Sequence, residues 1–348
     1  MQSKINLLHL ITGLGCGGAE KMVYQLCKYS DETQFDISVI SIDDTDYFLS
    51  KLQKLQIKVL KLGLKKNPLT FFNGILSLNK FIRKYKIQII HAHLFHAMMM
   101  SCVMKLLNPK LKIIWTGHNS RMISLWRSLI AFLTRRIRSH DIHLQTHLQA
   151  WYNAICSSTI PNGIEFPKIV ENNQKFKEFT FISVGSLEEQ KNHIFLIELF
   201  SKIDNYKLLI VGSGPEEKAI QNRINELGLM DNITLLGHRD DVYRLMQKSH
   251  CFLFPSLWEG LPLVVLESAY VKLPIITSSI ISMKKLISDD EGYVVPFNEF
   301  ERAIYSVVNN YADAEEKANR FYKRVKNDFD ILACTRNHEH LYRFLLNV

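Results

Sequence analysis

Two glutamates near the end of an apolar strand are well placed to do chemistry. Glu259 lies in the loop after the expected strand Cys251–Phe254, and Glu267 lies eight residues later on a helix that is expected to begin near Leu263. Carboxylates accept pairs of hydrogen bonds from neighbouring hydroxyl groups, so this spacing favours a polar ligand. A buried acid with a structural partner is the alternative for Glu267, because the helix around it is mostly apolar.

A glycine-rich loop at residues 13–18 separates an apolar strand, residues 5–11, from a helix over residues 19–29. Backbone N–H groups can approach a ligand closely at such a loop, and the positive end of the helix favours an anion. Aspartates at the end of the second strand lie where a nicotinamide-binding protein carries the acid that holds its cofactor. They are Asp43, Asp44 and Asp46. Nicotinamide binding therefore stays open, as does a tight turn with nothing bound.

Histidines follow or end two further expected strands. His91, His93 and His96 are spaced like metal ligands, and strand alternation places His91 and His93 on one side. No cysteine, aspartate or glutamate close in sequence completes a ligand set, so we expect no metal and assign these histidines to a cleft or to packing. His118 follows the expected strand Ile113–Gly117 and is a further candidate. A hydrogen-bonded loop histidine is the alternative for His118.

Alternating strands and helices predict how these side chains are positioned. Parallel strands joined by helices form open sheets that bind ligands beyond the carboxyl ends of the strands. Two such series follow one another, so we expect an α/β fold with two Rossmann-like domains that face each other across a cleft. The expected strands are 5–11, 35–42, 57–60, 87–92, 113–117, 142–146 and 159–160 in the first half, and 179–184, 207–211, 233–236, 251–254, 274–277 and 292–294 in the second.

The length of 348 residues also favours two domains, because it exceeds what one hydrophobic core usually supports. Pro161-Asn162-Gly163 has the composition of a connector. We expect residues 1–160 to form the first domain and residues 161–329 the second. The last helix, residues 330–348, is expected to pack back on the first domain.

Positive charge is concentrated in the first half. Residues 1–165 contain 21 Lys and Arg against 9 Asp and Glu, and no acid occurs between Asp46 and Asp141. The positive electrostatic field of such a segment attracts an anionic surface or substrate. Arg121–Arg138 combines five arginines with an apolar stripe, a pattern typical of a helix in a membrane interface, and Lys51–Lys66 adds six lysines. A core helix with a solvated basic edge is the alternative.

Other classes of protein fit less well. The N-terminus lacks the pattern of a signal peptide, and the longest candidate for a membrane span, Leu125–Leu133, is short and contains Arg127. The six cysteines are scattered, which favours reduced thiols. Nucleic-acid binding would need more aromatic platforms than Trp126 and Phe132, so we expect no nucleic-acid partner. The chain is expected to be cytoplasmic, and peripheral on the inner face of the plasma membrane.

Residues 254–269, FPSLWEGLPLVVLESA, carry a specific resemblance. This segment resembles the E-x7-E signature of retaining glycosyltransferase family 4, whose members have the two-domain GT-B fold. Other segments resemble motifs of this family in the same order along nearly the whole chain. They are Gly17-Gly18-Ala19-Glu20, His91-Ala92-His93, Thr116-Gly117-His118-Asn119, Pro161-Asn162-Gly163, Gly185-Ser186-Leu187-x3-Lys191-Asn192 and Val211-Gly212-Ser213-Gly214-Pro215.

The resemblance implies a role for each matching residue. Lys191 is expected to neutralise the diphosphate of a nucleotide sugar together with backbone amides at a helix N-terminus, so that no metal is needed. Glu259 is expected to contact the sugar hydroxyls, Glu267 the ribose, and His118 the reacting sugar. Without the motif, Lys191 would be an ordinary surface lysine. The remaining expected donor-binding residues are Gly17, Gly18, Ser186, Gly214, Pro215, Gly260, Leu261, Leu263 and Val264.

Two positions depart from the family pattern. Ser186 stands where the family usually has an arginine, which removes one expected contact with the diphosphate. Lys272 stands where a glycine usually precedes the next strand, which concerns a turn. The first departure puts the affinity for the donor in doubt.

The resemblance implies transfer of a hexosyl unit, with retention at the anomeric carbon, from a nucleotide sugar such as a UDP-sugar to an acceptor hydroxyl. The first domain is expected to bind the acceptor and the second the donor. A lipid-linked or polysaccharide acceptor of bacterial surface glycan synthesis and an anionic membrane surface are the further expected partners. A nicotinamide-dependent oxidoreductase and a nucleic-acid-binding protein are the alternatives, motivated by the glycine loop and the basic first half.

Overall fold

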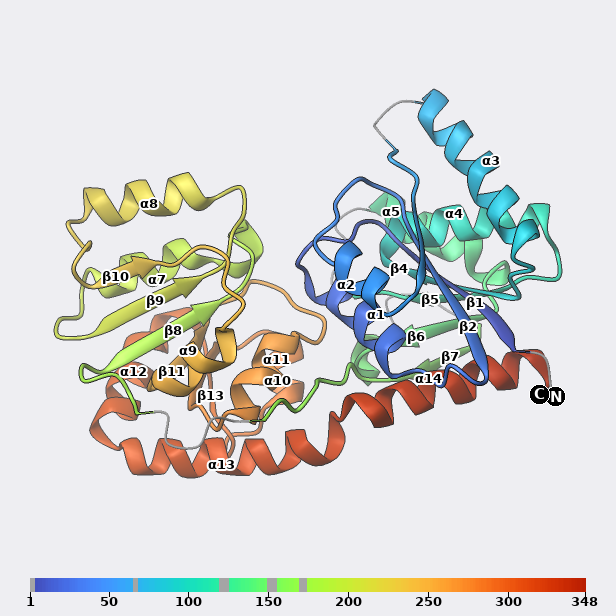
Figure 1. The fold of residues 1–348 in the computed structure, drawn as a ribbon. Helices are drawn as coiled ribbons and strands as arrows, with labels where there is room; N and C mark the ends of the chain where they lie inside the picture. Colours follow the sequence, from blue (N-terminus) through green and yellow to red (C-terminus); the bar gives the residue numbers. More distant parts are fainter. Residues whose placement is uncertain (1–3, 65–67, 119–124, 149–154, 169–173) are drawn as a thin grey trace. The chain divides into compact units, whose positions relative to one another are not determined.

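The computed structural model describes residues 4–64, 68–118, 125–148, 155–168 and 174–348 (Figure 1). The chain divides into two compact units: unit 1 is Met1–Glu165 with Ile331–Val348, and unit 2 is Phe166–Asp330. The first boundary follows Glu165 because the carboxylate of this residue accepts hydrogen bonds within unit 1, from Lys28 Nζ at 2.5 Å and Tyr29 Oη at 2.7 Å.

In its described part, unit 1 is built on seven parallel strands in the order β3-β2-β1-β4-β5-β6-β7. All but one residue of β1 and of β2 are buried, as expected where both faces of a parallel sheet are covered. The strands are β1 (Ile5–Ile11), β2 (Phe35–Ser41), β3 (Lys58–Lys61), β4 (Ile89–His93), β5 (Lys112–Thr116), β6 (His140–His143) and β7 (Ser157–Thr159).

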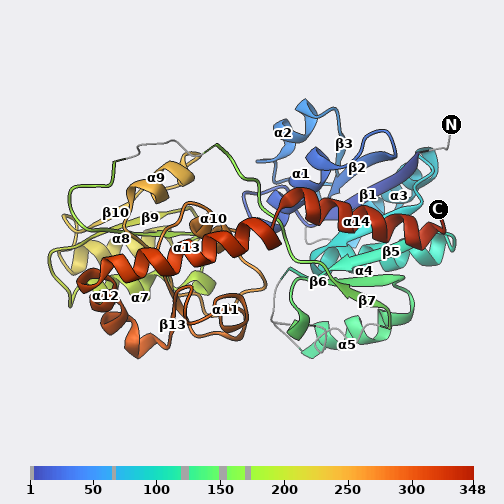
Figure 2. The same ribbon diagram turned by 90° about the horizontal axis from the view of Figure 1, so that it is seen from below.

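The helices of unit 1 cover the sheet, and the last helix of the chain is one of them. Helix α14 packs beside α1 (Figure 2), and its Tyr342 is 1% exposed in the same core cluster as Leu7 and Met22. The helices are α1 (Gly18–Tyr29), α2 (Leu49–Lys54), α3 (Pro68–Lys84), α4 (Leu94–Leu107), α5 (Leu125–Leu133) and α14 (Ile331–Leu346), with short turns η1 (Thr134–Arg136) and η2 (Thr146–Leu148).

The described part of unit 2 repeats this architecture with six parallel strands in the order β10-β9-β8-β11-β12-β13. The core on one side contains fully buried aromatic side chains such as Phe181, Phe200 and Phe300. The strands are β8 (Thr180–Val184), β9 (Lys207–Val211), β10 (Ile233–Leu235), β11 (Cys251–Phe254), β12 (Ile275–Ser278) and β13 (Tyr293–Val295).

Helices again connect the strands of unit 2. They are α7 (His193–Phe200), α8 (Glu217–Glu226), α9 (Val242–Lys248), α10 (Leu263–Tyr270), α11 (Ile281–Leu286), α12 (Phe300–Asn309) and α13 (Tyr311–Asp328), with turns η3 (Glu189–Lys191) and η4 (Phe297–Glu299). Helix α13 packs along α10, the helix that carries Glu267.

The predicted fold class is confirmed: two Rossmann-like units each contain a parallel sheet and connecting helices. The strands begin and end within three residues of the predicted positions. The largest shift is at the end of β6, which stops at His143 rather than at Thr146. This strand also begins at His140 rather than at Ile142, where the side chains of His140 and Asp141 bind Ser158 and Arg138. Among the described residues, none of the helices combines the length and the apolar character needed to cross a bilayer.

Candidate functional site

The strand order of unit 2 decides where its ligand site lies. Strands β8 and β11 are neighbours, and the chain continues from them toward opposite edges of the sheet. In open parallel sheets, ligands bind beyond the carboxyl ends of strands at such a switch point. The loop after β8 contains Ser186 and Lys191, and the loop after β11 contains Glu259 and Gly260. The strand order therefore brings the candidate site residues of unit 2 together at the carboxyl ends of β8 and β11.

Lys191 and Glu259 form an ion pair across this switch point. Lys191 Nζ donates to Glu259 Oε1 at 2.6 Å and lies 4.9 Å from the centre of the Phe254 ring. The lysine side chain is 15% exposed and the glutamate side chain 7%. An ammonium group has three donors, and this contact uses one of them. A cation held beside a carboxylate at the rim of the sheet can bind a ligand that carries both phosphates and hydroxyls.

Hydrogen bonds between the two loops hold this pair in position. The backbone N–H of Leu257 donates to the carbonyl of Gln190 at 2.8 Å, and the Gln190 side chain donates to the carbonyl of Trp258 at 2.8 Å. Asn192 has a left-handed conformation with φ 54, which ends the turn η3 and starts α7. Lys191 and Glu259 are thus each next to a residue that joins the loops.

Glycines allow the loops after β8 and β9 to lie against one another. A Cβ atom on Gly212, where φ is +148, would lie 1.8 Å from the carbonyl oxygen of Gly185, and one on Gly214 would lie 2.4 Å from that of Leu187. Glycine is therefore required at both positions for close packing. The predicted donor-binding residues Ser186 and Gly214 are partly buried, and Pro215 is exposed.

Helix α10 begins at Leu263, as predicted, and places Glu267 on its inner side. Glu267 is 5% exposed. The first N–H groups of a helix have no acceptors within the helix, so this end stabilises an anion. Among the residues predicted here, Gly260, Leu261 and Leu263 are buried and Val264 is partly buried.

In unit 1, the glycine loop leads directly into α1. Gly17 precedes the helix and Gly18 is its first residue. Asp43 accepts hydrogen bonds from Thr45, through the backbone N–H at 3.0 Å and the hydroxyl at 2.6 Å, and that hydroxyl accepts from the N–H of Leu14 at 2.8 Å. Asp43, which motivated the nicotinamide interpretation, therefore fixes the loop through Thr45.

His118, which follows β5, lies at the end of a chain of histidines. Its Nε2 is 3.1 Å from Nδ1 of His93, and Nε2 of His93 is 3.0 Å from Nδ1 of His9. The register of the sheet brings these residues together, because β1 and β4 pair His9 with His91 and Ile11 with His93. His91 bonds through Nδ1 to the Tyr342 hydroxyl at 2.8 Å. Three histidines therefore line up between the core and the end of β5.

Sequence reasoning missed His9, because it lies within the apolar run of β1. A single polar residue in a strand that is otherwise buried was the available signal. The side-chain nitrogens of His9, His91 and His93 lie within 4.8 Å of one another, although none of the described carboxylates or thiols joins this group. Burial lowers the pKa of His9 and of His118 to about 3 each, so both imidazoles are neutral at physiological pH.

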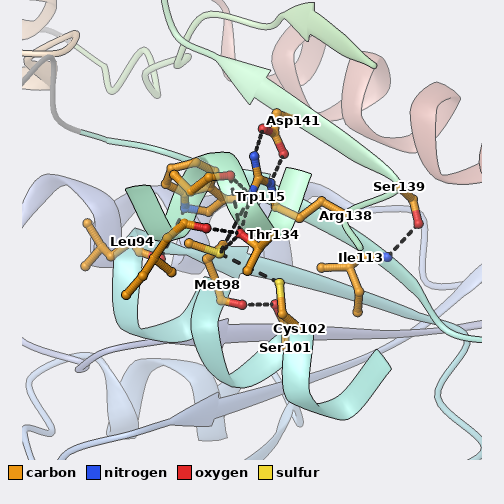
Figure 3. A network of polar contacts seen from close by, with 12 residues as sticks. Leu94, Met98, Ser101, Cys102, Ile113, Trp115, Thr134, Arg138, Ser139 and Asp141 are labelled. Atoms are coloured by element: carbon orange, nitrogen blue, oxygen red, sulfur yellow. Dashed lines mark hydrogen bonds and ion pairs between the residues drawn. The ribbon is translucent and has the colours of Figure 1, made fainter. Parts of the chain in front are cut away.

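The basic segment around α5 differs in part from its prediction. Arg138 was one of five arginines expected beside the apolar stripe, but its side chain is 1% exposed and forms two hydrogen bonds with Asp141, at 2.7 and 2.8 Å (Figure 3). It also donates to the carbonyl of Ala131 at 2.8 Å and to Thr134 at 2.7 Å, and so anchors the end of α5. Because Arg138 is buried and paired with Asp141, it does not contribute to the positive charge of the surface. Arg121 lies outside the described residues.

The apolar side of α5 is exposed, which contradicts the alternative of a core helix. Leu125 is 92% exposed, Leu129 57% and Leu133 64%. The guanidinium of Arg135 lies 3.9 Å from the centre of the Phe132 ring. Cations and apolar side chains therefore share one surface.

The lysine-rich segment 51–66 is partly neutralised by acids of the same unit. Lys58 forms an ion pair with Asp36 at 2.7 Å, and Lys61 lies 3.7 Å from the carboxylate of Asp46. Four lysines of this segment lie in the described part of the chain, so half of these have a partner acid; residues 65 and 66 lie outside it.

Comparison with known proteins identifies the class. Two units that each contain a doubly wound parallel sheet are shared with solved glycosyltransferases of the GT-B fold. The solved structure of Anabaena HepE in complex with UDP-glucose superposes with a TM-score of 0.84 at 17% identity, over 97% of this chain and 99% of that one. The chain is a glycosyltransferase of this fold.

Its two halves match two family descriptions. Residues 16–165 match "Glycosyltransferase Family 4" and residues 165–328 match "Glycosyl transferases group 1". An uncharacterized glycosyltransferase of Methanocaldococcus jannaschii is 29% identical over 250 residues, which are 61% of this chain and 62% of the relative. The UDP-Gal:alpha-D-GlcNAc-diphosphoundecaprenol alpha-1,3-galactosyltransferase of Escherichia coli is 26% identical over 343 residues, 88% of each chain. These matches set aside the oxidoreductase and nucleic-acid-binding alternatives.

Proposed function

We propose that the protein transfers a hexosyl unit from a nucleotide diphosphate sugar to an acceptor hydroxyl, with retention at the anomeric carbon. The observation that carries the proposal is the Lys191–Glu259 pair at the switch point of unit 2, 2.6 Å between Nζ and Oε1, just before the start of α10. The UDP-glucose bound to HepE and the UDP-galactose in the name of the E. coli relative support a UDP-sugar as the donor.

Charge neutralisation at the diphosphate is the main chemical task. When the bond between the anomeric carbon and the leaving phosphate breaks, negative charge develops on the nucleotide diphosphate. Lys191 and the N–H groups at the start of α10, around Gly260, Leu261, Leu263 and Val264, stabilise this charge. We propose that they do so without a metal.

The carboxylates then orient the donor. Glu259 accepts hydrogen bonds from the sugar hydroxyls, and Glu267 accepts them from the two ribose hydroxyls, because a carboxylate matches a pair of neighbouring donors. Ser186, Gly214 and Pro215 belong to the loops that bind the nucleotide diphosphate.

Unit 1 contributes the acceptor site, His118 and the glycine loop. His118 donates a hydrogen bond to the reacting sugar, and the backbone amides of Gly17 and Gly18 at the start of α1 bind negative charge. The name of the E. coli relative, which contains a diphosphoundecaprenol acceptor, supports a lipid-linked acceptor in bacterial surface glycan synthesis.

A screen of donors tests the function. The purified protein is incubated with UDP-, GDP- and dTDP-sugars, first with water as the acceptor and then with short polyprenyl diphosphate sugars. We expect release of the nucleotide diphosphate from one UDP-hexose, and an α-linked product from an α-linked donor, detected by NMR of the anomeric proton. Inversion would contradict retention, and no release from any donor would contradict the proposed reaction.

A lipid-linked acceptor lies at a membrane surface, and three helices of unit 1 present side chains suited to such a surface. Helices α3, α4 and α5 lie side by side in unit 1 (Figure 1), since α3 packs on α4 and Trp126 of α5 contacts Phe95 of α4 at 5.4 Å. Exposed apolar side chains occur on all three helices: Phe71, Phe72, Leu76, Leu106, Leu107, Leu125, Trp126, Leu129, Phe132 and Leu133. Together with Arg127, Arg135 and Arg136, they fit an anionic bilayer.

Vesicle binding provides the corresponding prediction. The protein is expected to bind phosphatidylglycerol vesicles at low salt and to be released at about 0.5 M salt, because surface attraction is screened. Leu125→Glu with Leu129→Glu is expected to weaken binding by about 10-fold or more. The matched control is Ile281→Glu on α11, an equally exposed side chain of unit 2 at 62%, which should leave binding unchanged. Equal binding by both variants, or none by the wild type, would contradict docking through α5.

A further inference from the structure

The hydrogen bonds between His118, His93 and His9 constrain one another. A neutral imidazole has one N–H donor and one unprotonated acceptor nitrogen. His93 uses both nitrogens in this chain, Nδ1 toward His118 at 3.1 Å and Nε2 toward His9 at 3.0 Å. If His93 donates to one neighbour, it must accept from the other. The two bonds therefore run in the same direction, either from His118 to His9 or from His9 to His118.

The buried end of the chain selects the direction. Nε2 of His9 is buried and has no hydrogen-bond partner among the described residues. If the bonds ran from His118 to His9, this atom would carry an N–H group with no acceptor. If they run from His9 to His118, it carries only a lone pair. Buried N–H groups without an acceptor are rarer in proteins than under-used acceptors, so the second direction is favoured.

We propose that His9 and His93 are positioning residues that hold His118 as the tautomer protonated on Nδ1. In this arrangement, Nε2 of His118 accepts from His93, and the proton on Nδ1 is available to the sugar donor. This inference rests on the proposed function, in which His118 faces the reacting sugar. It adds that the state of His118 is set by two residues that do not touch the substrate.

Neighbouring groups keep the middle of the chain in place. The rings of His91 and His93 lie against one another with their centres 4.1 Å apart and their planes tilted by 34°. His91 is itself held by the hydroxyls of Tyr342 at 2.8 Å and Thr116 at 2.7 Å. Tyr342 belongs to α14, which gives the last helix of the chain a link to His93. Burial lowers the pKa of His91 and of His93 well below the usual value, which keeps both rings neutral.

The same contacts argue against a metal ion in this group. Within the described part of the chain, five of the six ring nitrogens of His9, His91 and His93 already have hydrogen-bond partners. A bound metal would have to replace the bonds to Tyr342, Thr116 or His118. In the ranges that the structure describes, no carboxylate or thiol belongs to the group, although catalytic zinc sites often include one.

NMR of the ring nitrogens tests the proposal directly. Long-range proton–nitrogen spectra of protein labelled with 15N-histidine distinguish the two tautomers, and His118→Gln identifies the signals of His118. We expect protonated Nδ1 in the wild type and in His93→Asn, because the amide Nδ2 replaces the donor of His93. In His93→Leu, the proton of His118 is expected to move in part to Nε2. A wild-type His118 protonated on Nε2, or an unchanged tautomer in His93→Leu, would overturn the proposal.

Kinetics and a second pair of variants separate positioning from structural damage. His93→Leu is expected to lower kcat/KM about 10-fold, and His93→Asn to recover most of this loss. His9→Leu and His9→Asn should behave in the same way with smaller changes, so the test survives if one position does not tolerate substitution. Stoichiometric transition metal in the purified protein would overturn the assignment. Full activity of His118→Gln would contradict the proposed role of His118 itself, whereas the tautomer measurement would still stand.

Discussion

Replacing Lys191 with methionine is expected to lower kcat/KM for transfer by about 1,000-fold, because the variant loses the fixed cation that stabilises the leaving diphosphate. Methionine is one atom shorter than lysine but also unbranched, so its stem can still pack against Gly185. The affinity for UDP, measured by calorimetry, should fall as well. An unchanged affinity for UDP would contradict the role of Lys191.

The same change is expected to destabilise unit 2 by about 3–5 kcal/mol, since it leaves Glu259, whose side chain is 7% exposed, without its partner. The double variant Lys191→Met with Glu259→Gln removes both charges and is expected to regain most of that free energy of unfolding without regaining activity. Urea unfolding and initial rates measured together separate the two effects. Activity that returned along with stability would show that the pair has only a structural role.

A matched control is available in the same unit. Lys207 on β9 forms an ion pair with Glu178 at 3.4 Å, but the two side chains are 32% and 67% exposed. Exposed pairs contribute about 0–1 kcal/mol, so Lys207→Met should change stability and activity little. If this variant were as damaging as Lys191→Met, general loss of charge would explain both results.

Lowering the pH from 7.5 to 5.5 is expected to remove most of the stability of unit 1. His9, His91, His93 and His338 are fully buried, and burial lowers the pKa of each, to about 3 for His9 and about 4 for His338. In the unfolded chain these residues titrate near pH 6.5. Below that pH the unfolded state binds protons that the folded state does not. Their neutral forms therefore stabilise the fold fully above about pH 6.5, and this contribution is lost as the pH falls.

The expected size of the pH effect follows from the number of buried histidines. Each fully titrating histidine contributes about 1.4 kcal/mol per pH unit, so four give a slope of about 4–5 kcal/mol per pH unit between about pH 6 and 5. Urea unfolding at a series of pH values measures this slope. His338→Gln should reduce this slope by about 1.4 kcal/mol per pH unit. A free energy of unfolding that stays constant from pH 7.5 to 5.5 would refute the prediction.

Local patterns were sufficient for the fold class and for most of the elements. The run Ile5–Ile11 is apolar, the glycines at 13–18 open a helix, and both features depend only on neighbouring residues. The prediction that α10 begins at Leu263 is confirmed for the same reason, because a proline and an apolar run mark the start of a helix. The site residues were expected from motifs, and their roles stay predictions.

Surface charge was predicted less well, because the sequence does not show which charged residues find a partner. Arg138 and Asp141 are three residues apart, but their burial together depends on the packing of α5 and β6. Lys58 pairs with Asp36 because β2 and β3 are neighbours in register. Each pair offsets one cation of the basic surface expected for unit 1 and leaves the net charge of the unit unchanged. The exposed leucines of α5 increase the apolar area of that surface.

The sequence by itself determined which residues end strands, open helices and carry the motifs, because these features arise from contacts within a few residues. Only the tertiary structure decided that Lys191 meets Glu259, 68 residues later, and that His9 joins His93 and His118. Strand order and register bring such residues together, and both are set by burying apolar faces from distant parts of the chain. A histidine in an apolar strand therefore becomes part of a hydrogen-bonded chain only when the neighbouring strand is in place.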